Sequence, residues 1–107
     1  MANPIPRAQR ELVWERDRGQ CGRCGMKATD WHHRRSRRVR DEHTHCACVG
    51  VALCRTCHDR VHAGPTVATE TGFIVSMHEQ RPWTVPFRKF DGTTVWPTCD
   101  GGLEFGR

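Results

Sequence analysis

Two pairs of cysteines carry the clearest chemical signal in the sequence. Each pair has the spacing Cys-x2-Cys, and 29 residues separate Cys21 and Cys24 from Cys54 and Cys57. Four thiolates suit the tetrahedral coordination of zinc, and a two-residue gap allows one turn to present two sulfur atoms to the same ion. We therefore predict a structural zinc site at these four cysteines. Four reduced, buried cysteines are the alternative.

Histidines at two places in the sequence could form a second metal site. His32 and His33 lie at the end of a predicted strand, whereas His58 and His62 are four residues apart and share one face of a predicted helix. If strand and helix converge, His32, His58 and His62 can bind one ion with an open position for water or substrate, and His33 can face the substrate. The alternatives are scattered polar histidines, or His58 and His62 acting as ligands of the zinc ion.

A run of arginines follows the histidine pair directly. Its members are Arg34, Arg35, Arg37, Arg38 and Arg40. A guanidinium group forms bidentate hydrogen bonds with phosphate. We therefore expect the run to hold a nucleic-acid backbone beside the metal, with a solvated loop as the alternative. Backbone contacts carry no base information, so we expect low sequence specificity.

A further group of metal-binding residue types has no single interpretation. His43, His45, Cys46 and Cys48 lie within six residues of one another. They could hold another metal ion, or they could be ordinary loop and core residues. Cys99 stands apart in the sequence, and we expect a free thiol there.

Helices and strands are expected to position these residues. We predict a helix over 6–17, a short strand ending at His33, a charged loop over 34–44, a strand over 45–53 and a helix over 55–63 that Gly64 and Pro65 end. The remainder is expected to be β-rich over 66–97, with a strand at 73–77 and a hairpin whose strands, 87–90 and 93–96, flank Asp91-Gly92. The glycine-rich residues 98–107 are expected to be loose. The pattern predicts an α+β domain.

Length and composition restrict the class of protein. The 107 residues correspond to one domain. Hydrophobic residues make up 36% of the chain and there is no tyrosine, so metal ions or disulfides are needed to stabilise a thin core. No apolar run approaches the ~20 residues of a membrane span, and residues 1–10 lack the apolar segment of a secretory signal. We expect a cytoplasmic protein whose cysteines bind metal, and the net charge of +5 favours an anionic partner.

Two stretches resemble the HNH nucleases. Residues 31–37 read WHHRRSR, and residues 50–62 read GVALCRTCHDRVH. They are most similar to the small HNH proteins encoded by phages, especially phages of actinobacterial hosts. The resemblance covers residues 6–97 and is specific over the motif core at 21–62. It implies a ββα-metal (His-Me finger) fold braced by a four-cysteine zinc knuckle, with an N-terminal helix and a β-rich extension.

The resemblance also implies roles for individual residues. His32, His58 and His62 correspond to ligands of the catalytic metal, and His33 corresponds to the general base. The central asparagine of the family, which braces the loop between the two strands, is replaced by Val49. Valine has no polar side-chain atom, so the base is expected to be held less firmly and activity to be lower or lost.

The implied activity is metal-dependent hydrolysis of phosphodiester bonds in DNA. Histidine titrates in the range of a general base, and a divalent cation stabilises the charge that develops on the phosphate. An all-histidine ligand set favours Zn²⁺, Ni²⁺ or Mn²⁺ over Mg²⁺. By resemblance, phage terminase or other packaging proteins in the host cytoplasm are the expected protein partners. The alternatives are a zinc-stapled DNA-binding module that has lost activity and a protein-interaction module, which steep salt dependence of DNA binding would separate.

Overall fold

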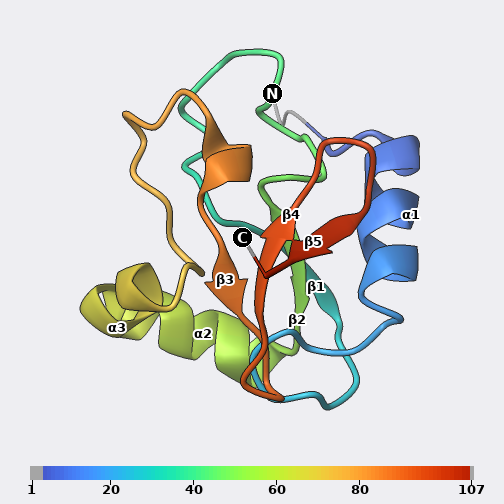
Figure 1. Ribbon diagram of the computed structural model, residues 1–107, viewed down its shortest axis with the longest axis vertical. Coiled ribbons are helices and arrows are strands. Elements are labelled where there is room, and N and C mark those ends of the chain that lie inside the picture. The colour runs from blue at the N-terminus through green and yellow to red at the C-terminus, as the bar shows by residue number, and fades with distance from the viewer. Residues whose placement is uncertain (1–3, 107) are drawn as a thin grey trace.

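A mixed α+β arrangement is present over residues 4–106, the part of the chain that the computed structural model describes (Figure 1). The elements are α1 (Arg7–Arg16), β1 (Asp30–His33), β2 (Gly50–Leu53), α2 (Arg55–Ala63), α3 (Pro65–Glu70), a 3-10 turn (Pro82–Thr84), β3 (Phe87–Arg88), β4 (Thr94–Pro97) and β5 (Leu103–Phe105). The predicted α+β class is confirmed. Within these residues, no helix is long and apolar enough to cross a membrane.

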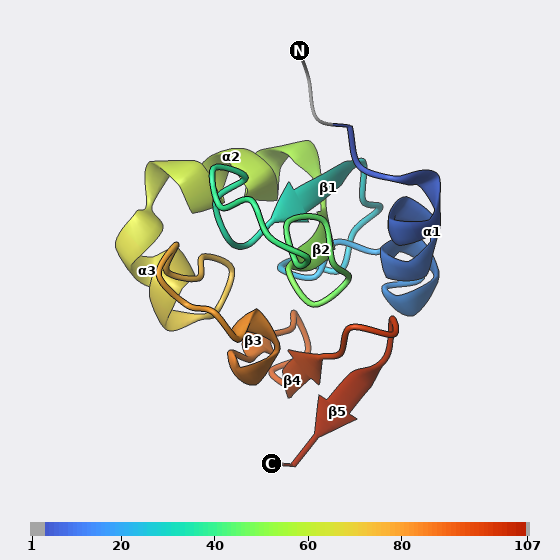
Figure 2. The ribbon, with the colours of Figure 1, turned by 90° about the horizontal axis from the view of Figure 1, so that it is seen from above.

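Strands β1 and β2 form an antiparallel pair that leads directly into α2. His33 pairs with Gly50 across the two strands. A Cβ atom at Gly50 would lie 2.2 Å from the Trp31 ring, so glycine is required where the tryptophan crosses β2. Only Cys54 separates β2 from α2, and Figure 2 shows the strand pair between α2 and α1. The connection therefore brings β1 beside α2.

Helix α1 is fastened to β2 by a buried ion pair at its C-terminal end. Nε of Arg16 lies 2.8 Å from Oδ1 of Asp17, and the two side chains are 2% and 6% exposed. Arg16 also donates to the carbonyl oxygens of Ala47 and Gly50, at 2.8 and 2.7 Å. Asp17 accepts a 2.9 Å hydrogen bond from the backbone N–H of Ala52. These bonds satisfy both buried charges and hold α1 against the strand pair.

The hydrophobic core is small and lies where β2 and α2 meet the C-terminal sheet. Its buried members are Cys21, Val51, Leu53, Cys57, Val61, Ala68, Phe73, Phe87 and Val95. The sheet has the antiparallel order β3-β4-β5. The predicted hairpin around Asp91-Gly92 is confirmed, although five residues, 89–93, connect its strands rather than two.

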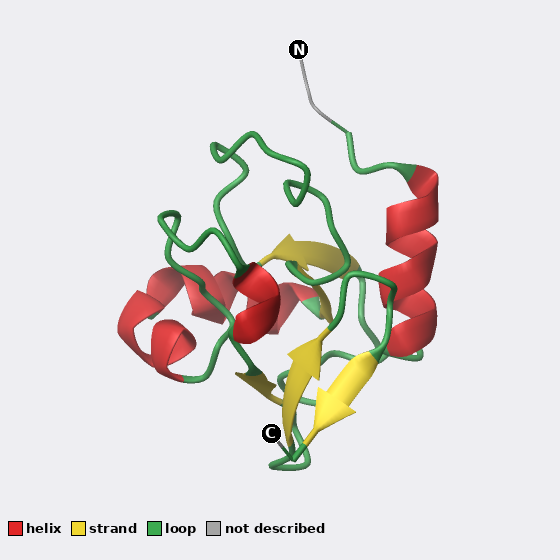
Figure 3. Cartoon of the chain, turned by 45° about the horizontal axis from the view of Figure 1, so that its top comes forward, coloured by secondary structure: helices red, strands yellow, loops and turns green. Residues whose placement is uncertain are grey.

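Several sequence-based element boundaries are wrong, and much of the chain is loop (Figure 3). Residues 45–49 lie in turns, in which the amides of Cys46 and Val49 bond to carbonyls three residues earlier, and the strand begins only at Gly50. Residues 73–77 form bends with a single bridge to Arg35 rather than a strand. The predicted helix over 55–63 is confirmed and ends before Gly64, but Pro65 begins a second helix, α3, where β-rich structure was expected, since proline is well suited to a first helical turn. Residues 98–107 are not all loose, because 103–105 form β5.

Candidate metal centre

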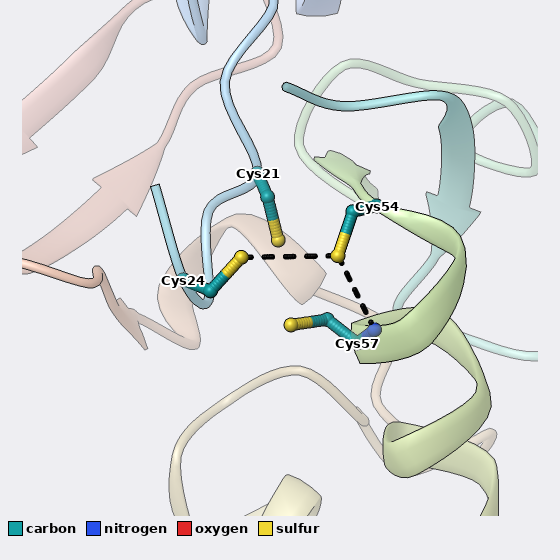
Figure 4. A group of neighbouring side chains, drawn as sticks. All are labelled: Cys21, Cys24, Cys54 and Cys57. Carbon is teal, nitrogen blue, oxygen red and sulfur yellow. Dashed lines mark hydrogen bonds between the residues drawn. The ribbon is translucent and has the colours of Figure 1, made fainter. Parts of the chain in front are cut away.

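The four predicted zinc ligands lie together (Figure 4). Cys21 and Cys24 come from the turn after α1, whereas Cys54 and Cys57 lie at the start of α2. The four sulfur atoms lie within 4.8 Å of one another, and all four cysteines are free. The group could therefore hold one metal ion, as the paired spacing predicts.

Local backbone structure shapes this four-cysteine group. The turn closes with hydrogen bonds from Cys21 N–H to the Met26 carbonyl and from Gly25 N–H to the Cys21 carbonyl, at 2.6 and 2.8 Å. Gly25 has a φ of +79°, which favours glycine. Burial raises the pKa of Cys21, but nearby backbone N–H groups, including that of Cys54, outweigh it and lower the pKa to about 7. The backbone thus favours the thiolate form that binds metal.

The three predicted histidine ligands also converge. One nitrogen from each of His32, His58 and His62 lies within 4.8 Å of the others. The centroid of the His32 ring lies 5.0 Å from that of His58 and 5.5 Å from that of His62. The end of β1 and one face of α2 therefore form a group that could hold a second metal ion.

His32 is oriented for a ligand. Its Nε2 atom lies 2.6 Å from the Phe73 carbonyl oxygen and must donate to it. Its Nδ1 atom is buried and has no hydrogen-bond partner among the described residues. Burial lowers the pKa of His32 to about 4, so the ring is neutral and Nδ1 carries a lone pair. A buried, unpartnered lone pair beside two other imidazoles fits a metal ion.

His58 is oriented by Asp30, which the sequence analysis did not single out. Nδ1 of His58 lies 2.8 Å from Oδ2 of Asp30, so Nε2 remains for a ligand. The hydrogen bond from His58 holds the pKa of the Asp30 carboxyl below its usual range. Asp30 precedes His32 by two residues in β1, and this spacing, which places two side chains on the same face of a strand, was the signal that could have identified it.

His33 lies in the same groove as the three candidate ligands. The groove has a volume of about 700 Å³, and Trp31, Arg37 and Arg38 also line it. Burial, together with the charge of Arg37, lowers the pKa of His33 to about 3, so the ring is neutral at pH 7. Its Nε2 atom lies 3.0 Å from Nδ1 of His45. A neutral imidazole in a groove can accept a proton from a bound water molecule.

The prediction that Arg34 contacts DNA is wrong. Its side chain is only 1% exposed, and its amino groups donate to the carbonyl oxygens of Cys48, Gly72, Pro82 and Val85. Arg34 therefore joins the loop before β2 to the segment that precedes β3. A guanidinium enclosed in this way cannot reach a phosphate.

The same prediction is wrong for Arg35. Arg35 is 2% exposed and is bound by the Asp41 carboxylate at 2.7 Å and the Glu79 carbonyl at 2.9 Å. Arg37, Arg38 and Arg40 are exposed, and the first two line the same groove as the histidines. The candidate DNA contacts are thus reduced to these three arginines.

Val49 occupies a fully buried position and bonds only through its backbone. Its carbonyl oxygen accepts a 2.7 Å hydrogen bond from Arg34 N–H, and its own N–H donates to the Cys46 carbonyl.

His43, Cys46, Cys48 and Cys99 form a third group whose ligand atoms lie within 4.8 Å of one another. Cys99 is a free thiol, as predicted, but the fold places it beside the other three residues although it stands apart from them in the sequence.

Comparison of the chain with known family models, curated proteins and solved structures finds no match. The described residues nevertheless form an α+β structure with Cys and His groups able to hold metal ions.

Proposed function

We propose that this protein is a metal-dependent DNA endonuclease of the HNH type. The observation that carries the proposal is the position of His33 beside three converging histidine side chains, His32, His58 and His62, in one groove. An antiparallel strand pair followed directly by a helix supplies these residues, as the ββα-metal fold requires. The four-cysteine group is proposed to hold a structural zinc ion that fixes α2 to the turn before β1.

The histidine trio fits a catalytic cation. His32 is buried with an unpartnered Nδ1 atom, and His58 is oriented by Asp30 in the manner of a carboxylate–histidine–metal arrangement. His62 is the exposed member, which leaves the site open toward the groove. When bound, the cation supplies Lewis-acid stabilisation of the charge on the phosphate and the leaving oxygen. The imidazole ligands favour Zn²⁺, Ni²⁺ or Mn²⁺ over Mg²⁺.

His33 is proposed as the general base. To accept a proton, it must donate its Nε2–H to Nδ1 of His45, which leaves a lone pair on its own Nδ1. The ring is neutral at pH 7, and a phosphate anion bound beside it raises its pKa toward a more effective base. Arg37 and Arg38 bind the DNA backbone at the edge of the groove.

A DNA-binding module without activity is the second candidate, because of Val49. Its buried isopropyl group cannot brace the loop by hydrogen bonding as the asparagine of the HNH family does. The two candidates share zinc binding and salt-dependent DNA binding, so only cleavage separates them. By resemblance to phage HNH proteins, the proposal extends to action with a terminase during genome packaging in the host cytoplasm.

Cleavage of supercoiled plasmid tests the proposal. The purified protein is treated with a chelator that leaves its fold intact and is then supplied with Mn²⁺, Ni²⁺, Zn²⁺ or Mg²⁺. We expect cutting that returns with metal and falls about 10²–10⁴-fold in His33→Ala, the contribution typical of a general base. His78→Ala, which alters an exposed histidine outside the three metal-binding groups, is the matched control.

Two results would contradict the assignment. Absence of cutting with every metal, from folded zinc-loaded protein that still binds DNA, would favour the binding module. Cutting that persists in His33→Ala would mean that another group acts as the base. Circular dichroism and zinc content of the variant must match those of the unmodified chain for either conclusion to hold.

A further inference from the structure

A third group of metal-binding side chains lies outside the proposed catalytic groove and outside the four-cysteine group. Its members are His43, Cys46, Cys48 and Cys99, and one ligand atom from each lies within 4.8 Å of all the others. Sγ of Cys99 is 3.8 Å from Nδ1 of His43. Three members come from the loop between β1 and β2, and Cys99 lies in the turn after β4, 56 positions from His43.

The donor set is that of a structural zinc site. Three thiols and one imidazole are a common tetrahedral zinc ligand set, Cys3His. Disulfide formation accounts for the group less well, because three thiols cannot all pair with one another and each cysteine is free. Metal binding also accounts for His43, whereas a disulfide has no use for an imidazole beside it.

We propose that His43, Cys46, Cys48 and Cys99 bind a second structural metal ion, zinc by the chemistry of its ligands. The ion joins the loop between β1 and β2 to the connection between β4 and β5. That connection reaches up beside α1 in Figure 1, where Gly101 packs against Leu12. A domain of this size has little core to hold either segment, and a metal ion supplies the missing stabilisation.

The site also has a consequence for the catalytic groove, which rests on the proposed nuclease function. His45 lies between two of the ligands in the sequence, and its Nδ1 atom is 3.0 Å from Nε2 of His33. Fixing His43 and Cys46 therefore fixes the residue that orients the base. The metal ion takes over the bracing of this loop, which Val49 cannot provide.

Substitution with Co²⁺ tests the proposal, because thiolate-to-cobalt charge-transfer bands report Co–S bonds and a histidine-only site contributes none. The reduced full-length chain is unfolded, stripped of metal and refolded with Co²⁺. We expect a band intensity of seven Co–S bonds in the unmodified chain and of about four in Cys99→Ser, whereas His43→Ala, which retains all three thiols, is expected to need more Co²⁺ to reach seven. His78→Ala is the matched histidine control and is expected to retain all seven. Native mass spectrometry of the zinc protein is expected to show one tightly bound ion fewer in Cys99→Ser.

Several outcomes would overturn the proposal. These are a band of only four Co–S bonds in the unmodified chain, an unchanged band in Cys99→Ser, or a disulfide within this group in protein purified under reducing conditions. If Cys99→Ser fails to fold, His43→Ala and the unmodified chain still decide the question. Metal content is measured without DNA, so a second ion in a protein that cuts no DNA would leave this inference standing and remove the proposed function.

Discussion

Nε2 of His33 lies 3.0 Å from Nδ1 of His45, so the end of β1 is hydrogen-bonded to the middle of the loop that connects it to β2. The two residues are 12 positions apart. The hydrogen bond has its proton on Nε2 of His33 or on Nδ1 of His45, and His33 keeps a lone pair on Nδ1, as a base needs, when its own Nε2 is the donor.

His45→Ala is expected to lower cleavage about 10–100-fold, the range found when a hydrogen-bonding partner of a site histidine is removed. The loss should fall on kcat with KM unchanged, because His45 positions the base and contacts no substrate. His45→Gln retains an acceptor and should recover part of the rate. The acidic limb of the pH–rate profile should move to lower pH in His45→Ala, since protonated His33 loses a hydrogen-bond acceptor. A positioning role would be contradicted if His45→Ala and His45→Gln lost the same amount of activity and also the same amount of folding stability.

Asp30→Asn is expected to weaken metal binding at the group formed by His32, His58 and His62 about 10–100-fold, because the carboxylate orients the His58 ring and increases its basicity. Calorimetric titration of Mn²⁺ or Zn²⁺ into protein whose cysteines retain zinc measures the change. Asp59→Asn is the matched control, since Asp59 is exposed on α2, the helix that carries His58, and forms a 3.9 Å ion pair with Arg55. Equal affinities in the two variants would contradict a role for Asp30 at the metal.

Arg34 and Arg38 should respond to substitution in opposite ways. Arg34→Met is expected to lower the free energy of unfolding by at least about 3 kcal/mol, because several buried carbonyl oxygens lose their donor and each unsatisfied group costs about 1–3 kcal/mol. Arg38→Ala should leave stability unchanged and reduce the salt dependence of DNA binding by about one phosphate contact. Urea denaturation and fluorescence anisotropy at several salt concentrations measure the two effects. A destabilised Arg38→Ala, or a stable Arg34→Met with weakened DNA binding, would reverse these assignments.

The buried histidines predict a stability that falls in acid. Burial lowers the pKa of His33 from 6.5 to about 3, so the folded chain binds fewer protons here than the unfolded chain does. The free energy of unfolding is therefore greatest above about pH 6.5 and decreases as the pH falls from there toward 3. Denaturant titrations at pH 7.5, 6 and 5 are expected to show a shallower decrease in His33→Gln than in the unmodified chain. Comparing the two chains cancels the loss of zinc, which both undergo in acid. Parallel curves would show that His33 is not buried as a neutral ring.

Features that depend on near neighbours in the sequence were predictable. The Cys-x2-Cys spacing determines a turn that presents two sulfur atoms, and two such turns share an ion wherever the chain brings them together. The four-residue spacing of His58 and His62 places both on one helical face. Asp91-Gly92 predicts a chain reversal, and the hairpin lies there. In each case the backbone geometry of a few neighbouring residues is enough to predict the feature.

Tertiary structure alone decided which side chains are buried and which distant residues meet. Arg34 and Arg38 belong to one run of charge, yet the segment after α3 covers the first and leaves the second in solvent. Cys99 is isolated in the sequence, but the connection between β4 and β5 returns it to His43. Burial and metal coordination depend on the path of segments far apart in the chain, and local spacing contains no information about that path. The sequence by itself therefore determined the ligand types and their local pairs, whereas the fold decided which of them share a site and which arginines face solvent.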